Sequence, residues 1–263
     1  MTIDQVTRSE VEWERWHAQR EADLATEYGW LSLTGFAWLP GEPGTVDGLP
    51  GRWWASAVDA HVEADADAGI TVDGKPVDGV IAATVAEAGS LDWVRVGTRR
   101  VQLLLRGGRF AVRTRDASAP TRARFDGVPT FEYDPAWVVE GRLTRWAEPR
   151  RVEVATARAD LRQHVRLIGE LELELAGQSH RLAVGESADG ALTLIFHDAT
   201  NGAETALWRT VTTGVPSADG TAEVDFNRTL NLPYAFTEFG TCPAPPSGNR
   251  IETRVTAGEK APA

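Results

Sequence analysis

Cysteine is almost absent from this sequence, which has a single one, Cys242, in 263 residues. One thiol excludes an intramolecular disulfide and a zinc site built from several thiolates. No stretch reaches the roughly 20 uncharged apolar residues that a membrane-spanning helix requires. The first residues also lack the basic and apolar segments of a secretory signal peptide. We therefore expect a cytoplasmic protein with no membrane partner.

Common catalytic signatures are missing as well. The sequence has no G-x-S-x-G elbow, P-loop, G-x-G-x-x-G motif or H-E-x-x-H motif, which removes the usual hydrolase, kinase, dehydrogenase and metalloprotease assignments. Histidines stand at positions 17, 61, 164, 180 and 197. His180 and His197 could meet Asp198 on neighbouring strands, but strand histidines more often face water or bond to a loop. We predict no metal site, and no motif specifies a cofactor.

Positive charge is scarce over the whole chain, whose net charge is −11. Nucleic acid is therefore not expected as a partner, because phosphate binding depends on a coherent basic surface. Residues 91–166 are the exception, with 16 Lys and Arg against 9 Asp and Glu. Within them, "RFAVRTRD" (109–116) alternates arginines with Phe110 and Val112, as a half-buried strand does. We predict that Arg109, Arg113 and Arg115 form a solvated face; an anion-binding surface is the alternative.

One helix is evident near the N-terminus. Ser9 is a suitable N-cap, and apolar or long residues then recur at three- and four-residue steps from Trp13 through Trp16 and Leu24 to Tyr28. Gly29 ends the pattern. The spacing predicts an amphipathic helix that packs one stripe against the rest of the protein.

The remaining sequence has the pattern of short antiparallel strands. Hairpins are predicted in "GWLSLTGFAWLPGEPG", at the Asp-Gly turns of "ITVDGKPVDGVIAATV", at Gly107-Gly108, near Gly177 and around Asn201-Gly202. We find no alternation of strands and helices that would indicate a parallel sheet. The fold class is therefore mainly β: an antiparallel barrel or a two-sheet sandwich, with the N-terminal amphipathic helix. We divide the chain into a helical extension (1–29), a single β domain (30–257) and a flexible tail (258–263).

The segment "FNRTLNLPYAFTEFGTCPAPPSGNR" (226–250) cannot form regular structure, yet it is rich in aromatic rings and prolines. The prolines restrict the backbone, so the segment loses less entropy when it is ordered. If the preceding strand continues, Asn227 lies on the outward side with Asp225. Arg228 then points inward and needs a buried acidic or carbonyl partner. We predict that this arginine is either a structural link to the domain or the anchor of a pocket.

Several motifs together resemble a bacterial family catalogued as domain of unknown function 1684. They are "LIFHDATNGAET", "VDFNRTLNLPYAFTEFGTCPAPPSGNRI", "GWLSLTGFAWL" and "YDPAWVVEGRL", so the resemblance covers most of the chain. It implies no established activity. The sequence departs from the family pattern at Tyr234, where a cysteine is usual, and at His197, where a basic residue is usual. Positions that match, and where a common site is expected, are Asp198, Asn227, Arg228, Asn231, Pro233, Phe236, Cys242, Pro243 and Asn249.

Two classes of function follow. The first is a β domain that binds a small molecule, an anionic one being favoured by the guanidinium, in a pocket under the C-terminal proline-rich loop. The residues expected to line it are Asn227, Arg228, Tyr234, Phe236, Cys242, Asp198 and Asn249. The alternative is a hydrolase or transferase that uses Cys242, or the carboxylates of Asp198 and Asp225, in the same pocket. Asp198 also has a structural explanation, as the cap of a turn. The sequence specifies neither the ligand nor an oligomeric state.

Overall fold

The computed structural model describes residues 3–262 and divides into two compact units. The inserted unit is Asp23–Phe125, and the C-terminal unit combines Met1–Ala22 with Asp126–Ala263. Each unit has its own hydrophobic core, and the single β domain of residues 30–257 stays a prediction. The predicted extension and tail also included residues 1, 2 and 263, which lie outside the described residues.

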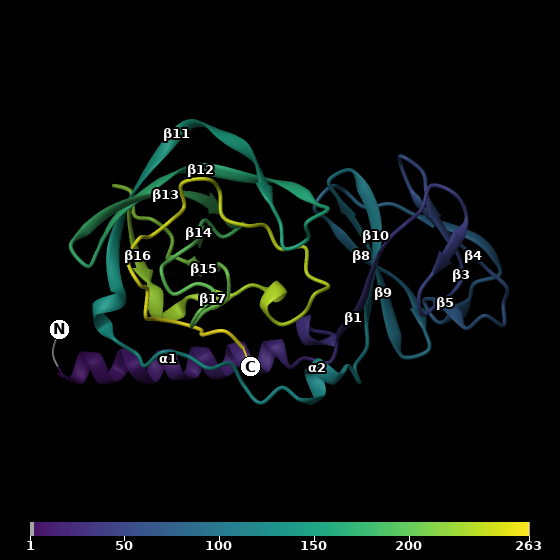
Figure 1. Ribbon diagram of the computed structural model, residues 1–263, viewed down its shortest axis with the longest axis horizontal. Helices are drawn as coiled ribbons and strands as arrows, with labels where there is room; N and C mark the ends of the chain where they lie inside the picture. Colours follow the sequence, from purple (N-terminus) through teal and green to yellow (C-terminus); the bar gives the residue numbers. More distant parts are fainter. Residues whose placement is uncertain (1–2, 263) are drawn as a thin grey trace. The chain divides into compact units, whose positions relative to one another are not determined.

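The inserted unit is a sandwich of two antiparallel sheets (Figure 1). One sheet has the order β1-β10-β9-β8-β5-β6 and the other β2-β3-β4-β7, and the side chains between them include Trp53, Val62 and Leu103. Its elements are η1 (Trp30–Ser32), β1 (Leu33–Trp38), β2 (Gly44–Val46), β3 (Leu49–Ala55), β4 (Ala60–Ala64), β5 (Ile70–Val72), β6 (Lys75–Pro76), β7 (Gly79–Ala83), β8 (Ser90–Val96), β9 (Arg99–Arg106), β10 (Arg109–Arg115) and α2 (Pro120–Ala123).

The C-terminal unit contains one antiparallel sheet of seven strands, in the order β16-β11-β12-β13-β14-β15-β17. Helix α1 (Ile3–Leu24) begins in this unit. The other elements are η2 (Pro135–Trp137), β11 (Val138–Ala155), β12 (Arg162–Leu175), β13 (Gln178–Glu186), β14 (Leu192–Phe196), β15 (Arg209–Thr212), β16 (Thr221–Asp225), η3 (Phe226–Arg228), β17 (Leu230–Asn231) and η4 (Pro233–Ala235).

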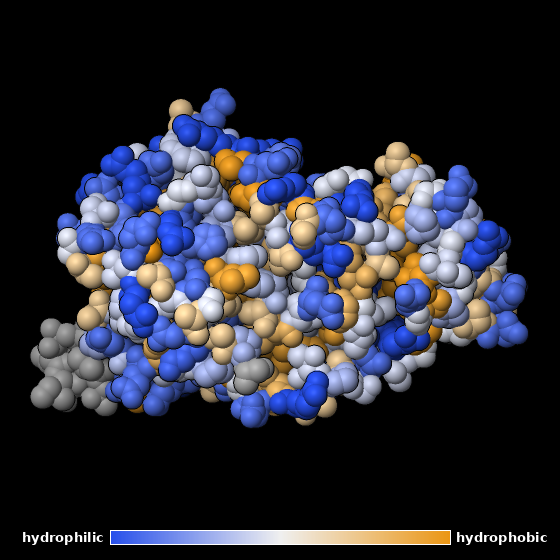
Figure 2. All heavy atoms as spheres, in the orientation of Figure 1, coloured by the Kyte–Doolittle hydropathy of each residue, from blue (hydrophilic) through white to orange (hydrophobic). Residues whose placement is uncertain are grey.

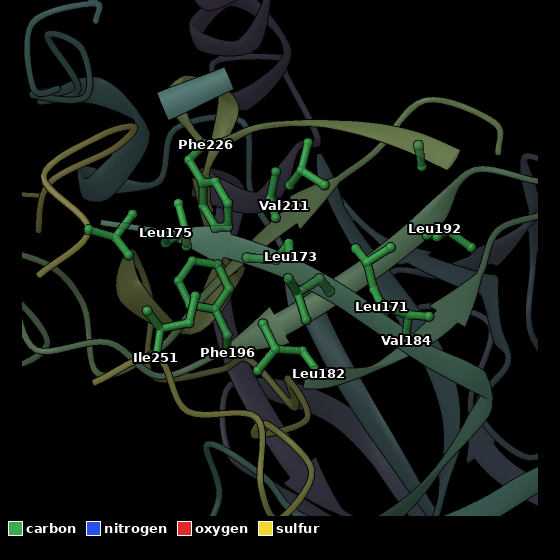
Figure 3. Packing of buried hydrophobic residues seen from close by; sticks show 14 of the residues in the cluster. Leu171, Leu173, Leu175, Leu182, Val184, Leu192, Phe196, Val211, Phe226 and Ile251 are labelled. Carbon is green, nitrogen blue, oxygen red and sulfur yellow. The ribbon is translucent and has the colours of Figure 1, made fainter. Parts of the chain in front are cut away.

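The two-residue period of the strands explains where this sheet buries its apolar residues. In β12, Leu171, Leu173 and Leu175 are buried, and the glutamates between them lie on the opposite face. Figure 3 shows Leu173 and Leu175 on the side of Phe196 and Phe226, and Leu171 near Val184 and Leu192; all belong to one core cluster. The opposite face of β13 and β14 carries Ala183, Gly185, Thr193 and Ile195.

The predicted fold class is confirmed: the protein is mainly β, its sheets are antiparallel, and the long helix is N-terminal. Each sheet has two end strands, so none closes into a barrel within residues 3–262, and the arrangement fits the sandwich alternative. Hairpins are confirmed at Asp73-Gly74, Gly107-Gly108 and Gly177, and β14 pairs with β15 around the Asn201 loop.

Three local predictions are wrong. The stretch from Trp30 to Gly44 is not one strand pair, because β1 pairs with β10 and β2 pairs with β3. Asp78-Gly79 does not turn a hairpin; β7, which follows it, pairs with β4. The helix runs from Ile3 to Leu24 instead of starting after Ser9 and reaching Tyr28. The first two differences arise because long-range pairing in another sheet replaces pairing between neighbours.

The arginine row of β10 is not a solvated face. Arg109 is exposed, but Arg113 and Arg115 are buried. Arg113 bonds to the Gln102 side chain, and Arg115 donates to the backbone oxygens of Tyr28 and Gly29. Both guanidiniums also lie near the ring of Trp30, at 5.0 and 5.2 Å from its centroid. Carbonyls, an amide and an aromatic ring thus replace water around these charges.

No described helix is both long and apolar enough to cross a membrane. On the face in Figure 2, hydrophobic residues lie in small groups between hydrophilic ones. The end of the chain, predicted as a flexible tail, is instead packed: Gly258 and Glu259 are buried. Glu259 accepts hydrogen bonds from Arg20 and from the Asn231 backbone, which places its carboxylate inside the C-terminal unit.

Candidate functional site

The prediction that Arg228 points into the interior is wrong. Strand β16 ends at Asp225, whose carboxylate accepts a hydrogen bond from the Asn227 N–H and starts the turn η3. This turn breaks the two-residue alternation, so Asn227 becomes buried and the Arg228 side chain stays 39% exposed. Arg228 lies 3.2 Å from Asp225 and 5.5 Å from the centroid of the Trp16 ring.

Asn227 connects three segments of the C-terminal unit. Its side chain accepts from the Asp134 N–H and donates to the Asp134 oxygen, at 3.1 and 3.0 Å. Its backbone oxygen accepts a 2.8 Å bond from the Trp13 indole of α1. With its amide satisfied in this way, Asn227 holds α1 and the segment before β11 in place.

The buried guanidinium of this unit belongs to Arg209, on β15. It donates to the Asp198 carboxylate at 2.8 Å and to the backbone oxygens of Val255, Ala257 and Glu259. Burial lowers the pKa of Arg209, and the Asp198 charge opposes that change. Asp198 also accepts from Thr200, so its carboxylate fixes the loop after β14. The Arg209–Asp198 pair anchors the C-terminal segment to the sheet. A buried guanidinium with acidic and carbonyl partners is the arrangement that we predicted for Arg228.

Tyr234 and Phe236 pack against side chains of the same unit. The Tyr234 hydroxyl donates to the Trp208 oxygen and accepts from the Trp208 N–H, both at 2.7 Å. The two rings stack at 4.0 Å, and burial raises the pKa of Tyr234. Phe236 has the guanidinium of Arg20 6.0 Å from its ring centroid.

Cys242 is buried where the proline loop, residues 242–249, begins. Its backbone oxygen accepts from Ala157, and the N–H of Ala244 donates to Ala155, so the loop starts along the end of β11. We find no helix N-terminus beside Cys242 in the described secondary structure.

At its other end the proline loop is held by Asn249. The Asn249 side chain accepts from the Ala183 N–H and donates to the Ala183 and Ile195 oxygens, at 2.8, 2.8 and 2.9 Å. Strands β13 and β14 pair only at Gly185 and Glu186. Beyond that point the Asn249 amide takes the place of a missing strand pair between them. The loop therefore runs from β11 to the outer face of β13 and β14 (Figure 1).

A cavity of about 180 Å³ lies where the proline loop meets this outer face. Pro246 and Asn249 line it from the loop, and Ala183 and Ile195 line it from the strands. Its wall is mostly apolar because β12, β13 and β14 present small and aliphatic residues on the face opposite the core. The remaining lining residues are Val165, Arg166, Leu167, Gly185, Glu186 and Thr193.

Arg166 supplies positive charge at this cavity, and its side chain is exposed. It stands directly opposite Arg151 in the pairing of β11 with β12. Like charges in this position repel, and neither arginine has an ion pair within 4 Å among the described residues. Glu186, the acidic lining residue, bonds to Arg145, and this bond together with the nearby charge of Arg166 lowers the pKa of Glu186. The local balance therefore favours a negatively charged group beside Arg166.

Of the residues expected to line a pocket, only Asn249 lines this cavity. Asp198, Asn227, Arg228, Tyr234, Phe236 and Cys242 are placed elsewhere in the C-terminal unit. Sequence reasoning missed Arg166, Ala183, Ile195 and Pro246. Strand alternation places Ala183 and Ile195 opposite the core, but no local signal shows that a loop covers them. In the described part of the chain, no three His, Cys, Asp or Glu residues gather as a metal site.

The cavity lies within a region shared with other proteins. The model of a family described as "Protein of unknown function (DUF1684)" matches residues 123–260, just over half of the chain. The chain is a DUF1684 protein. The motif at Gly29–Leu39 lies outside the matched residues, so the resemblance is established for a smaller part than the sequence motifs indicated. All residues that line the cavity are inside it.

A solved relative of this DUF1684 protein is an uncharacterised protein from Haloarcula marismortui. The two sequences are 30% identical over 53% of this chain and 78% of that chain, with a TM-score of 0.43. No curated protein resembles the chain closely enough to count as a match. The family and its relative thus bring no activity to this protein, and function has to be argued from its own residues.

Proposed function

We propose that this DUF1684 protein binds a small anionic molecule with an apolar body in the cavity under the proline loop. The single cysteine supports a reducing, cytoplasmic compartment for this activity. The observation that carries the proposal is the combination of an aliphatic wall with the guanidinium of Arg166, which stands opposite Arg151 and has no ion pair within 4 Å among the described residues. Ligand sites of globular proteins have this composition: mostly apolar, with a few polar groups that fix orientation.

The size of the cavity limits the ligand. Drug-sized molecules occupy roughly 300–1,000 Å³, and this cavity offers about 180 Å³. Its apolar walls, Ala183, Ile195 and Pro246, fit a compact aliphatic or single-ring body. Arg166 at the same cavity fits a carboxylate, since a guanidinium donates two parallel hydrogen bonds to such a group.

Titration of benzoate tests the proposal, because benzoate joins one ring to one carboxylate. Calorimetry should show saturable binding of benzoate and about tenfold weaker binding of benzyl alcohol, which lacks the charge. Arg166→Met should lower benzoate affinity by a similar factor, and Ala183→Phe should abolish binding by filling the cavity. Arg162→Met and Ser179→Phe are matched controls, on the same strands but outside the cavity, and should bind as the wild type does.

Absence of saturable benzoate binding, or equal loss in variants and controls, would contradict the proposal.

The enzymatic alternative has no comparable support. Cys242, Asp198 and Asp225 do not line the cavity, and the two carboxylates are already engaged by Arg209 and by the turn η3. A carboxylate held in this way is poorly placed to exchange protons with a substrate.

A further inference from the structure

The inserted unit has a pocket of its own, of about 190 Å³. Charged residues of both signs line it: Asp73, Asp92, Arg95 and Arg100. The buried ring of Trp93 forms part of its wall. The cavity under the proline loop, in contrast, has a mostly aliphatic wall, with Arg166 and Glu186 as its charged residues. The two sites therefore suit different ligands.

Local sequence explains how the four charges come together. Asp73 and Gly74 form the tight turn between β5 and β6, both with positive φ, as an Asp-Gly hairpin turn requires. Strand β8 pairs with β5 on one side and with β9 on the other, so that Arg95 stands directly opposite Arg100. A bulge next to Asp92 breaks the register of β8 before these arginines.

Two of the four charges are held in position. The guanidinium of Arg100 lies 3.8 Å from the centroid of the Tyr28 ring, and the Tyr28 hydroxyl bonds to the Thr98 oxygen at 2.8 Å. The Asp92 carboxylate accepts from Gln102 at 3.1 Å and lies 3.5 Å from Arg100. Stacking on a ring fixes the plane of a guanidinium and leaves its edge for an acceptor.

The other two charges have no partner. Arg95 and Asp73 are exposed, and neither makes a hydrogen bond or ion pair with another side chain in the part of the chain that the structure describes. Arg95 and Arg100 also repel each other across the strand pair. The pocket thus presents an unpaired cation, Arg95, directly opposite Arg100, and an unpaired anion, Asp73, that lines the same pocket as Asp92.

We propose that this pocket binds a small zwitterion, of the class of free α-amino acids. The carboxylate would lie between Arg95 and Arg100, and the ammonium group between Asp73 and Asp92. A simple anion would lie beside two carboxylates and a simple cation beside two guanidiniums. Only a ligand with both charges pairs with all four groups, which makes the selectivity electrostatic.

The test uses the full-length protein labelled with ¹⁵N and three probes: glycine, acetate and methylammonium. Glycine should cause saturable amide shifts at Thr71, Trp93 and Arg95, and each single-charge probe at the same concentration should cause at most a fifth of that shift. Arg95→Gln and Asp73→Asn should each weaken glycine binding at least fivefold. Asparagine also tolerates positive φ, so the second variant keeps the turn.

Lys75→Gln is the control. It removes a charge two residues from Asp73, on β6, without touching the pocket lining, and should leave glycine binding unchanged. Acetate shifts equal to those of glycine would overturn the proposal in favour of a simple anion site. Lack of saturable glycine shifts, or the same loss in Lys75→Gln as in Arg95→Gln, would overturn it as well. Benzoate binding should be unaffected by these variants, so the two sites are tested separately.

Discussion

At the scale of single residues, Asn249 joins the proline loop to the sheet. Replacing Asn249 by alanine leaves the N–H and oxygen of Ala183 and the oxygen of Ile195 without these bonds. We expect the free energy of unfolding to fall by about 2–4 kcal/mol, because unsatisfied buried groups each cost about 1–3 kcal/mol. Urea denaturation measures the change. Gln178→Ala, which removes an exposed amide with one 3.4 Å bond, should cost less than 0.5 kcal/mol by the usual surface range of about ±0.5.

An effect of Asn249→Ala no larger than that of Gln178→Ala would show that the loop is held by other contacts. Benzoate affinity should fall in Asn249→Ala as well, because the loop supplies Pro246 to the cavity. If the variant binds benzoate normally, the loop does not shape the site.

We expect the protein to lose stability at alkaline pH because of Tyr234. Burial raises its pKa in the folded protein above the ordinary value of 10.0. The unfolded chain therefore loses this proton first as the pH rises past about 10, and the folded state loses stability in that range. Below pH 10 the contribution is fully present. Urea denaturation at several pH values measures this. The free energy of unfolding should decline less steeply at alkaline pH in Tyr234→Phe than in the wild type. At pH 7 the variant should be about 1–2 kcal/mol less stable than the wild type.

Parallel declines in the wild type and Tyr234→Phe would contradict this assignment. Tyr28→Phe is the control, because its hydroxyl bonds to an exposed backbone oxygen in the inserted unit. It should change the free energy of unfolding at pH 7 by less than about 0.5 kcal/mol.

At the scale of elements, helix α1 is tied to the end of the chain through Arg20. The guanidinium lies 3.1 Å from the Glu259 carboxylate, whose side chain is 1% exposed. Arg20→Met leaves that carboxylate buried with less compensation, so we expect a loss of about 3 kcal/mol. The double variant Arg20→Met/Glu259→Gln should recover at least about 1 kcal/mol of it, since the uncompensated charge is gone.

A double-mutant cycle by urea denaturation measures this coupling. Arg15→Met, at an exposed position on the same helix, should change stability by less than about 0.5 kcal/mol. Additive effects of Arg20→Met and Glu259→Gln would mean that the two side chains do not stabilise each other.

At the scale of the whole molecule, each compact unit has a separate core. Leu103 belongs to the core of the inserted unit and Leu171 to that of the C-terminal unit, and both are 0% exposed. Leu103→Ala should cost about 2–5 kcal/mol. Hydrogen exchange should become faster mainly at amides of residues 23–125, and Leu171→Ala should act on the seven-stranded sheet. Equal acceleration in both units by either variant would show one cooperative structure.

Sequence alone predicted much of the fold but little of the site. The alternation of glutamate and leucine in β12 was sufficient to predict a strand with one buried face, because this pattern depends only on neighbouring residues. Asn249 was also expected to line a pocket, because it matches the family pattern. Arg166 and Ala183 were not expected to line a pocket, because the loop that covers them is more than 50 residues away in the sequence.

The sequence by itself determined the class of the protein: antiparallel strands, most of the hairpin turns and an N-terminal amphipathic helix. These follow from residue periods and turn chemistry, which act over a few residues. Only the tertiary structure decided that Arg209, and not Arg228, is the buried arginine of the C-terminal unit. The strand before Arg228 ends at Asp225, so its alternation does not reach Arg228, and Arg209 lies where Asp198 and the C-terminal carbonyls converge. Burial of a charge depends on partners brought from distant segments, and no local pattern records them.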